Sequence, residues 1–185
     1  MERAVYKYTY NFIFEHSRLY AYQSGFIRGH STVCQLLEMY HRVCQNLDER
    51  LSTTRILIFC DNSKAFDRVW HEGLIKKLKS HGISGDLLIW FKNYLSGRKQ
   101  FVFVNNELSD SGLVKAGVPQ RSVLGPLLFS LYINDITDNL VNLARLFADD
   151  TPLSYFGKHF DLMQIEKHND LQILDQWAKY MACRL

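Results

Sequence analysis

The sequence lacks several features that would assign a chain to a class at once. It has no stretch of eighteen apolar residues, so no membrane-spanning helix is expected. Internal repeats, low-complexity linkers and a signal-peptide pattern at the N-terminus are also absent. No pair of cysteines has the short spacing of a zinc site, which favours reduced thiols in an intracellular protein; the four are Cys34, Cys44, Cys60 and Cys183.

The composition is that of an ordinary globular protein. Of the 185 residues, 47% are hydrophobic and 22% are charged, which is enough for one domain, or one and a half, with a sizeable core. The formal net charge of +3 is compatible with a polyanionic partner but does not select one.

Hydrophobic periodicity and turn residues predict an α+β domain with a mostly antiparallel sheet and helices packed on one side of it. Residues 1–22 fit either a strand over 6–14 or a helix over 9–20. Thr32 and Gln35 form a plausible capping box for the next helix. Helices are predicted over 33–49, 71–80, 84–95, 122–136 and 161–181, and strands over 55–61, 99–104, 107–115, 142–148 and 151–156.

Three carboxylates stand at the ends of predicted strands. Asp61 ends an apolar, apparently buried run, and Asp149 and Asp150 form the tip of the predicted 142–156 hairpin. Such carboxylates are costly without a compensating cation, and two divalent ions would suit phosphoryl or nucleotidyl transfer. Taken alone, however, Asp149 and Asp150 are more typical of a polar hairpin tip, because Asp favours turns.

Three segments, in order, resemble polymerase motifs of the reverse transcriptases of non-LTR (LINE-like) retrotransposons. They are Asp61–Asp67 (DNSKAFD), Gly117–Pro126 (GVPQRSVLGP) and Phe147–Asp150 (FADD). The connecting segments 24–32, 69–71, 94–98 and 132–136 are similar to the same family, so the resemblance covers about residues 20–180. One motif would be weak, but several in family order are specific.

The resemblance implies a right-hand polymerase palm, with its antiparallel sheet and helices on one face, plus partial fingers. Residues 1–54 would be the partial fingers region and 55–185 the palm region. The family's thumb would be absent, so we expect the chain to be part of a longer polyprotein. Its expected location is the cytoplasm, the nucleus or both, with no membrane partner.

The implied activity is RNA-directed DNA polymerisation, the transfer of a nucleotide from a dNTP to the 3′-hydroxyl of a DNA primer on an RNA template. Asp61 and Asp149 would be the principal ligands of two Mg²⁺ ions, with Asp150 beside them and Mn²⁺ as a possible substitute. A rival hypothesis is another two-metal enzyme such as a nuclease, which leaves Phe66 and Gln120 without a purpose.

Three further residues would bind the incoming dNTP. Phe66 resembles the steric gate that rejects a ribose 2′-hydroxyl, although core packing would also explain an aromatic ring there. Gln120 would contact the nucleotide. Arg28 would bind the triphosphate, or it is a solvated loop cation. Template and primer could bind a set of basic residues that also fits an ordinary solvated face: Lys76, Lys77, Lys79, Arg98 and Lys99.

One position departs from the family pattern. Arg121 stands where the family usually has glycine after the motif glutamine. Glycine permits close approach and unusual dihedral angles, so an arginine there is expected to impair activity. The alternative to an active polymerase is therefore a truncated, catalytically impaired remnant that only binds nucleic acid.

Overall fold

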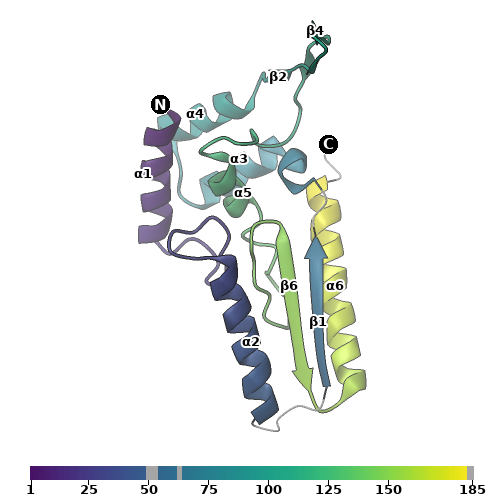
Figure 1. The fold of residues 1–185 in the computed structure, drawn as a ribbon. Coiled ribbons are helices and arrows are strands. Elements are labelled where there is room, and N and C mark those ends of the chain that lie inside the picture. The colour runs from purple at the N-terminus through teal and green to yellow at the C-terminus, as the bar shows by residue number, and fades with distance from the viewer. Residues whose placement is uncertain (49–53, 62–63, 183–185) are drawn as a thin grey trace.

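The computed structural model describes residues 1–48, 54–61 and 64–182, which form a mixed α+β fold with small antiparallel sheets (Figure 1). Its helices are α1 (Glu2–Glu15), α2 (Thr32–Asp48), the 3₁₀ turn η1 (Ala65–Arg68), α3 (His71–Ser80), α4 (Gly85–Leu95), α5 (Gly125–Tyr132) and α6 (Phe160–Ala182). Its strands are β1 (Thr54–Asp61), β2 (Lys99–Gln100), β3 (Phe103–Val104), β4 (Glu107–Leu108), β5 (Gly112–Leu113) and β6 (Asp150–Gly157).

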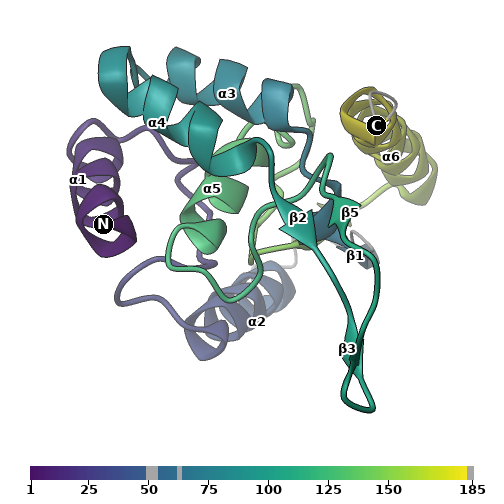
Figure 2. The same cartoon turned by 90° about the horizontal axis from the view of Figure 1, so that it is seen from above.

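A long two-stranded ribbon of β1 and β6 carries the acidic residues. The strands pair antiparallel over their whole length, from Thr54 opposite Gly157 to Asp61 opposite Asp150. Helix α6 runs along the ribbon, and α2 lies on the other side, beyond β6 (Figures 1 and 2). The ribbon is therefore supported along its length by helices from both ends of the sequence.

Strand β1 is less buried than its apolar sequence predicted. Leu57 is 41% exposed and Phe59 is 65% exposed, whereas Ile56 and Ile58 pack against the core. Side chains alternate between the faces of a strand, and only one face of β1 meets the core. The prediction of a strand was right, and the prediction that it is buried was wrong.

Several helix ends differ from the predicted ones. Residues 2–15 form a helix, so the strand alternative over 6–14 was wrong and the helix alternative was right in kind, although its bounds of 9–20 lie too late. Residue 49, the predicted end of the next helix, lies outside the described residues. Helix α2 begins at Thr32, and the side chain of Ser31 accepts a hydrogen bond from the Cys34 backbone N–H. The cap is therefore Ser31 rather than Thr32.

Helix α5 is shorter than predicted, because it starts at Gly125 and ends at Tyr132. Pro126 stands in its first turn, where a missing N–H is harmless. Ser122 still serves the helix start, since its Oγ accepts a hydrogen bond of 2.9 Å from the Gly125 N–H. Beyond Tyr132 the chain continues in turns to about Ile136.

A protruding hairpin between α4 and α5 confirms the predicted strands over 99–115 in outline (Figure 2). It is interrupted, with β2 paired to β5 at its base and β3 paired to β4 at its tip. Asn105 and Asn106 form the tip with φ angles of 51° and 65°, a conformation that Asn tolerates better than most residues.

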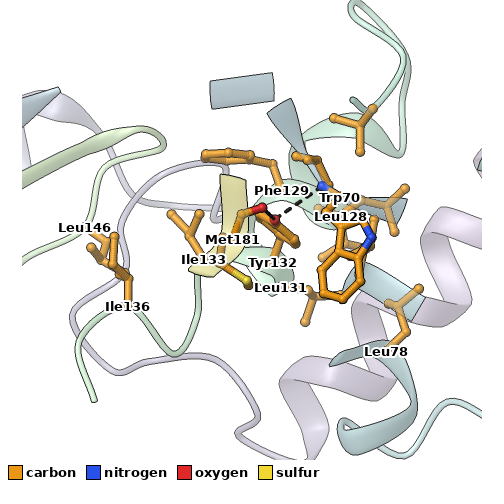
Figure 3. Packing of buried hydrophobic residues seen from close by; sticks show 14 of the residues in the cluster. Trp70, Leu78, Leu128, Phe129, Leu131, Tyr132, Ile133, Ile136, Leu146 and Met181 are labelled. Atoms are coloured by element: carbon orange, nitrogen blue, oxygen red, sulfur yellow. Dashed lines mark hydrogen bonds between the residues drawn. The ribbon is translucent and has the colours of Figure 1, made fainter. Parts of the chain in front are cut away.

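The core gathers around α5, where Tyr132 connects three elements (Figure 3). Its hydroxyl accepts a hydrogen bond of 3.2 Å from the Trp70 backbone N–H, just before α3. The same hydroxyl donates one of 3.4 Å to the Met181 carbonyl, at the end of α6. Tyr132 is only 4% exposed, so these bonds form in a nearly dry environment.

The structure also bears on membrane-spanning helices and on the cysteines. Within the described residues, no helix combines the length and apolar character needed to cross a bilayer. Cys34, Cys44 and Cys60 are free thiols, and Cys183 lies outside the described residues.

Replacing Tyr132 with Phe should lower the free energy of unfolding by about 1–2 kcal/mol, because the buried Trp70 N–H loses its acceptor. Urea denaturation monitored by tryptophan fluorescence measures the change. The matched control is Tyr8→Phe, at a side chain that is 75% exposed, which should shift stability by less than about 0.5 kcal/mol. Equal stability of the two variants would contradict the role of the Tyr132 hydroxyl.

Candidate active site

The acidic residues meet where β1 ends and β6 begins. Asp61 and Asp150 are directly opposite each other in the ladder. The preceding turn is closed by two hydrogen bonds of 3.0 Å between the backbones of Phe147 and Asp150. Ala148 stands in this turn with a φ of 55°, and Asp149 follows it. The tip of the hairpin is therefore Ala148–Asp149, and Asp150 is already the first residue of β6.

The carboxylates influence one another. Partial burial, then the charge of Asp149 and then that of Asp61 raise the pKa of Asp150 above its ordinary value. The charges of Asp149 and Asp61 thus help to disfavour ionisation of Asp150. Asp61 and Asp150 are exposed, so a cation could approach them from solvent.

The donor set fits hard divalent ions such as Mg²⁺, which prefer carboxylate oxygens. In the part of the chain that the structure describes, no group of three or more His, Cys, Asp or Glu side chains is arranged to hold a metal ion by itself. Mg²⁺ sites that also use substrate phosphates need only one or two carboxylates from the protein.

The segment 22–25, before α2, packs against the acidic turn and the residues leading into it. Ser24 N–H donates a hydrogen bond of 2.8 Å to the Leu146 carbonyl, and Leu146 N–H donates one of 3.0 Å to the Tyr22 carbonyl. Next to this pairing, Gly25 is buried against the backbone of Ala148. The acidic turn is thus bounded by β1 on one side and by residues 22–25 on the other.

The glycine-containing loop that begins at Gly117 packs against η1. Val118 N–H donates to the Phe66 carbonyl at 2.9 Å, and Gly117 N–H donates to the Val69 carbonyl at 2.8 Å. Gly117 has a φ of 86°, and a Cβ there would lie 2.8 Å from the carbonyl oxygen of Asp67. Glycine is therefore required at this position both by conformation and by space.

Phe66 and Gln120 both belong to this contact, Phe66 in η1 and Gln120 in the loop that begins at Gly117. The Phe66 ring stacks on Phe129 with centroids 4.3 Å apart, and it meets the Phe26 ring edge-on at 5.9 Å. The side-chain amide of Gln120 donates a hydrogen bond of 2.8 Å to the Asp67 carboxylate. Phe66 thus packs against other aromatic rings, in line with the core-packing alternative given for it above. The Gln120 amide is hydrogen-bonded to a carboxylate.

Arg28 lies against α1. Its guanidinium carbon is 4.8 Å from the centre of the Tyr10 ring, and its backbone N–H donates to the Tyr10 hydroxyl. The side chain is exposed. Its role in triphosphate binding stays a prediction.

A basic cleft of about 910 Å³ opens beside Gln120. Its cationic lining residues are Lys64, Arg98, Lys99 and Lys115. Arg98 donates through Nη2 to the Gly117 carbonyl at 3.2 Å, while its Nε and Nη1 are buried without a hydrogen-bond partner among the described residues. Unused donors of this kind favour an anionic ligand.

Sequence reasoning missed two residues of this region. Gly25 was noted only as part of a loop and of a family-like segment, although glycine in such a segment signals a close backbone approach. Asp67 was named only as the end of the first motif segment, whereas it accepts a hydrogen bond from the Gln120 amide in the second motif segment. The signal that could have identified both residues is that each belongs to a segment resembling the family.

Comparisons with known proteins show the family of this chain. The family model for reverse transcriptase (RNA-dependent DNA polymerase) matches residues 1–185. The chain is 37% identical, over 72% of its length and 15% of the relative's, to the probable RNA-directed DNA polymerase from transposon BS of Drosophila melanogaster. It is 32% identical, over 89% of its length and 18% of the relative's, to that from mobile element jockey of the same organism.

Solved structures share the fold at low sequence identity. Telomerase from Candida albicans, determined with a fragment of telomeric RNA, matches with a TM-score of 0.68 and 12% identity, over 91% of this chain and 32% of that one. Apo telomerase from Candida tropicalis matches with a TM-score of 0.69 and 13% identity, over 98% and 38%. The chain spans less than a fifth of the length of the curated relatives described above. By its family model and its sequence relatives, the chain belongs to the reverse transcriptase (RNA-dependent DNA polymerase) family.

Proposed function

We propose that this domain catalyses RNA-directed DNA synthesis for a non-LTR retrotransposon, adding dNTPs to a primer 3′-hydroxyl on an RNA template. The observation that carries the proposal is the placement of Asp61 opposite Asp150, with Asp149 next to it, at one end of the β1–β6 ribbon in a chain of this family. Within a longer polyprotein, residues 55–185 would act as the palm and residues 1–54 as part of the fingers.

The three carboxylates would hold two Mg²⁺ ions, with Mn²⁺ as a substitute. When bound, the ions would make the primer hydroxyl more acidic and offset the charge of the phosphates. The protein's own contribution is to keep the carboxylates together against their mutual repulsion, which, after partial burial, raises the pKa of Asp150. Pairing of Asp61 opposite Asp150 supplies that constraint through the backbone ladder.

Phe66 and Gln120 would recognise the dNTP beside these carboxylates. Stacking of Phe66 on Phe129 stiffens the ring, and a stiff ring penalises an additional ribose 2′-hydroxyl more than a mobile one. The Asp67 carboxylate fixes the orientation of the Gln120 amide, which reduces the ordering needed on binding. Arg28 would reach the triphosphate by leaving the Tyr10 ring.

The basic cleft would bind the phosphate backbone of the template. Four cations line it, and the one carboxylate among its lining residues, Asp67, is hydrogen-bonded to Gln120. Such contacts are electrostatic and independent of base sequence, so binding should weaken as salt increases. Of the basic residues singled out from the sequence, Arg98 and Lys99 lie in this cleft, whereas Lys77 pairs with Asp135.

Asp149→Ala should abolish extension of a DNA primer on an RNA template in the presence of dNTPs and Mg²⁺. The expected loss is at least about a hundredfold, because a metal-binding charge is removed from the reacting centre. The measurement is incorporation of labelled dNTP by the purified chain.

The control is Asp161→Ala in the first turn of α6, after the other end of β6, which should leave extension unchanged. Extension that persists in Asp149→Ala would contradict the assignment. An inactive parent chain that still binds RNA in a salt-sensitive way would favour the second candidate, an impaired remnant.

Charge reversal in the basic cleft should weaken RNA binding. The double variant Lys99→Glu and Lys115→Glu should lower affinity by about tenfold or more at low salt and should make log Kd less steep in log salt by about one to two units. Fluorescence anisotropy with a labelled single-stranded RNA measures both. The matched control, Lys7→Glu with Lys92→Glu, changes the charge equally on exposed faces of α1 and α4. An equal effect of both doubles would show that only the total charge matters.

The observation that favours the impaired remnant is the conformation of Arg121. This residue has a φ of 58°, a region that costs an ordinary residue about 1–2 kcal/mol and costs glycine nothing. Its side chain is exposed, so the backbone rather than packing makes the position unsuited to arginine.

Arg121→Gly should raise the polymerase rate and should stabilise the fold by about 0.5–1 kcal/mol, since relief of the strained φ exceeds the entropy that glycine loses on folding. Primer extension and urea denaturation measure the two effects. Arg121→Ala separates them, because it removes the cation and keeps the strain. A glycine variant that is no faster than the parent would rule out Arg121 as the cause of impairment.

A further inference from the structure

Gly25 makes an unusually close contact with the turn that carries the acidic pair. A Cβ built on Gly25 would lie 2.1 Å from the backbone nitrogen of Ala148, 2.9 Å from its Cα and 3.0 Å from the carbonyl carbon of Phe147. All three are backbone atoms, so no side chain can rotate to make room. Any larger residue at position 25 must move the main chain of one segment or the other.

The glycine is needed here for space rather than for conformation. Its φ lies outside the left-handed region, unlike those of Gly29 and Gly97, which have φ angles of 82° and 66° and open space around them. The backbone of Gly25 would therefore accept an alanine without strain if the neighbouring turn were absent. The constraint comes entirely from the acidic turn.

Hydrogen bonds hold both sides of this contact in place. Ser24 and Tyr22 pair with Leu146 on the arm leading into the turn, and the Gly25 N–H donates a bond of 2.8 Å to the Gln23 side chain. Leu146 is fully buried. Retreat of either segment would break bonds in a region with little access to water, which is unfavourable.

The opposite side of the turn faces β1. The Phe147 and Asp150 backbones are hydrogen-bonded to each other, so movement at Ala148 is transmitted to Asp149 and Asp150 together. Asp150 is in turn the ladder partner of Asp61. A displacement of the turn therefore changes the position of two carboxylates relative to the third.

The same loop also reaches the proposed dNTP pocket. Phe26 follows Gly25 directly and meets the Phe66 ring edge-on at 5.9 Å. The segment 22–26 thus contacts both the acidic turn and Phe66, two regions that are far apart in the sequence.

We propose that Gly25 is a positioning residue for the acidic pair: the absence of a side chain at this position sets the distance of the Asp149–Asp150 turn from Asp61. The inference rests on the proposed function only in assigning metal binding to these three carboxylates. The contact itself is independent of that assignment, so the two can fail separately.

The test compares Gly25→Ala with Gly112→Ala in the same chain. Gly112 is the matched control, because its φ is also outside the left-handed region and an added Cβ would come no closer than 4.0 Å to the Gln100 oxygen. Hydrogen–deuterium exchange of the segment 144–150 should be about tenfold faster in Gly25→Ala than in the parent or in Gly112→Ala. Unchanged exchange in Gly25→Ala would overturn the inference.

Binding of Mn²⁺ alone, measured by electron paramagnetic resonance, gives the second readout. The relevant Mn²⁺ binding is the part that Asp149→Ala removes. Gly25→Ala should weaken this binding by about tenfold or more, as the loss of a supporting residue does at other metal sites. Gly112→Ala should leave it unchanged. Full-strength binding in Gly25→Ala would also overturn the inference. If the parent chain binds no Mn²⁺ through Asp149, the proposed function fails, and hydrogen exchange still decides the role of Gly25.

Should Gly25→Ala fail to fold, a second variant decides the question. Ala148 has a φ of 55°, so glycine at 148 would give the turn additional backbone freedom to move away from the new methyl group. Recovery of folding in Gly25→Ala with Ala148→Gly would support a clash at this contact. No recovery would show that the damage lies elsewhere and would overturn the inference.

Discussion

The pairing of β1 with β6 is the constraint on which the candidate site depends. Eight successive residue pairs end with Asp61 opposite Asp150, so the relative position of two carboxylates is set by main-chain hydrogen bonds rather than by flexible side chains. Because side chains alternate across a strand, a slip of one strand by one residue would place the two carboxylates on opposite faces of the ribbon. The helices, the Tyr132 hydrogen bonds and segment 22–25 all support this one alignment.

Much of the secondary structure could be predicted because its signals are local. The His71–Ser80 helix matches its predicted bounds, since apolar spacing and the following Gly82 both act over a few residues. The errors concern choices that tertiary contacts decide. Ser31 rather than its neighbour Thr32 caps α2, and α5 ends at Tyr132, whose hydroxyl is bonded to Trp70 and Met181. Neither choice is visible in periodicity.

The candidate site likewise has features that could be predicted from the sequence and features that could not. Its acidic residues and the family were predicted from motif segments, and the family is confirmed by the comparisons. What the sequence does not encode locally is contact between motifs. Gln120 bonds to Asp67, and Gly25 abuts Ala148, each across a long stretch of chain. Such contacts follow only from the packed fold, so Gly25 was left without a role.

The β1–β6 pairing also has a consequence for how the molecule acquires its chemistry. Its two strands are separated by a long stretch of chain that includes α3, α4 and α5, and the entropic cost of closing such a loop makes the pairing slow. Helix α3 contacts α4 and α5, all within the stretch that lies between the two strands, so these contacts can form while Asp61 is still far from Asp150. During synthesis on the ribosome, the chain would therefore carry much of its helical structure before Asp61 and Asp150 came together.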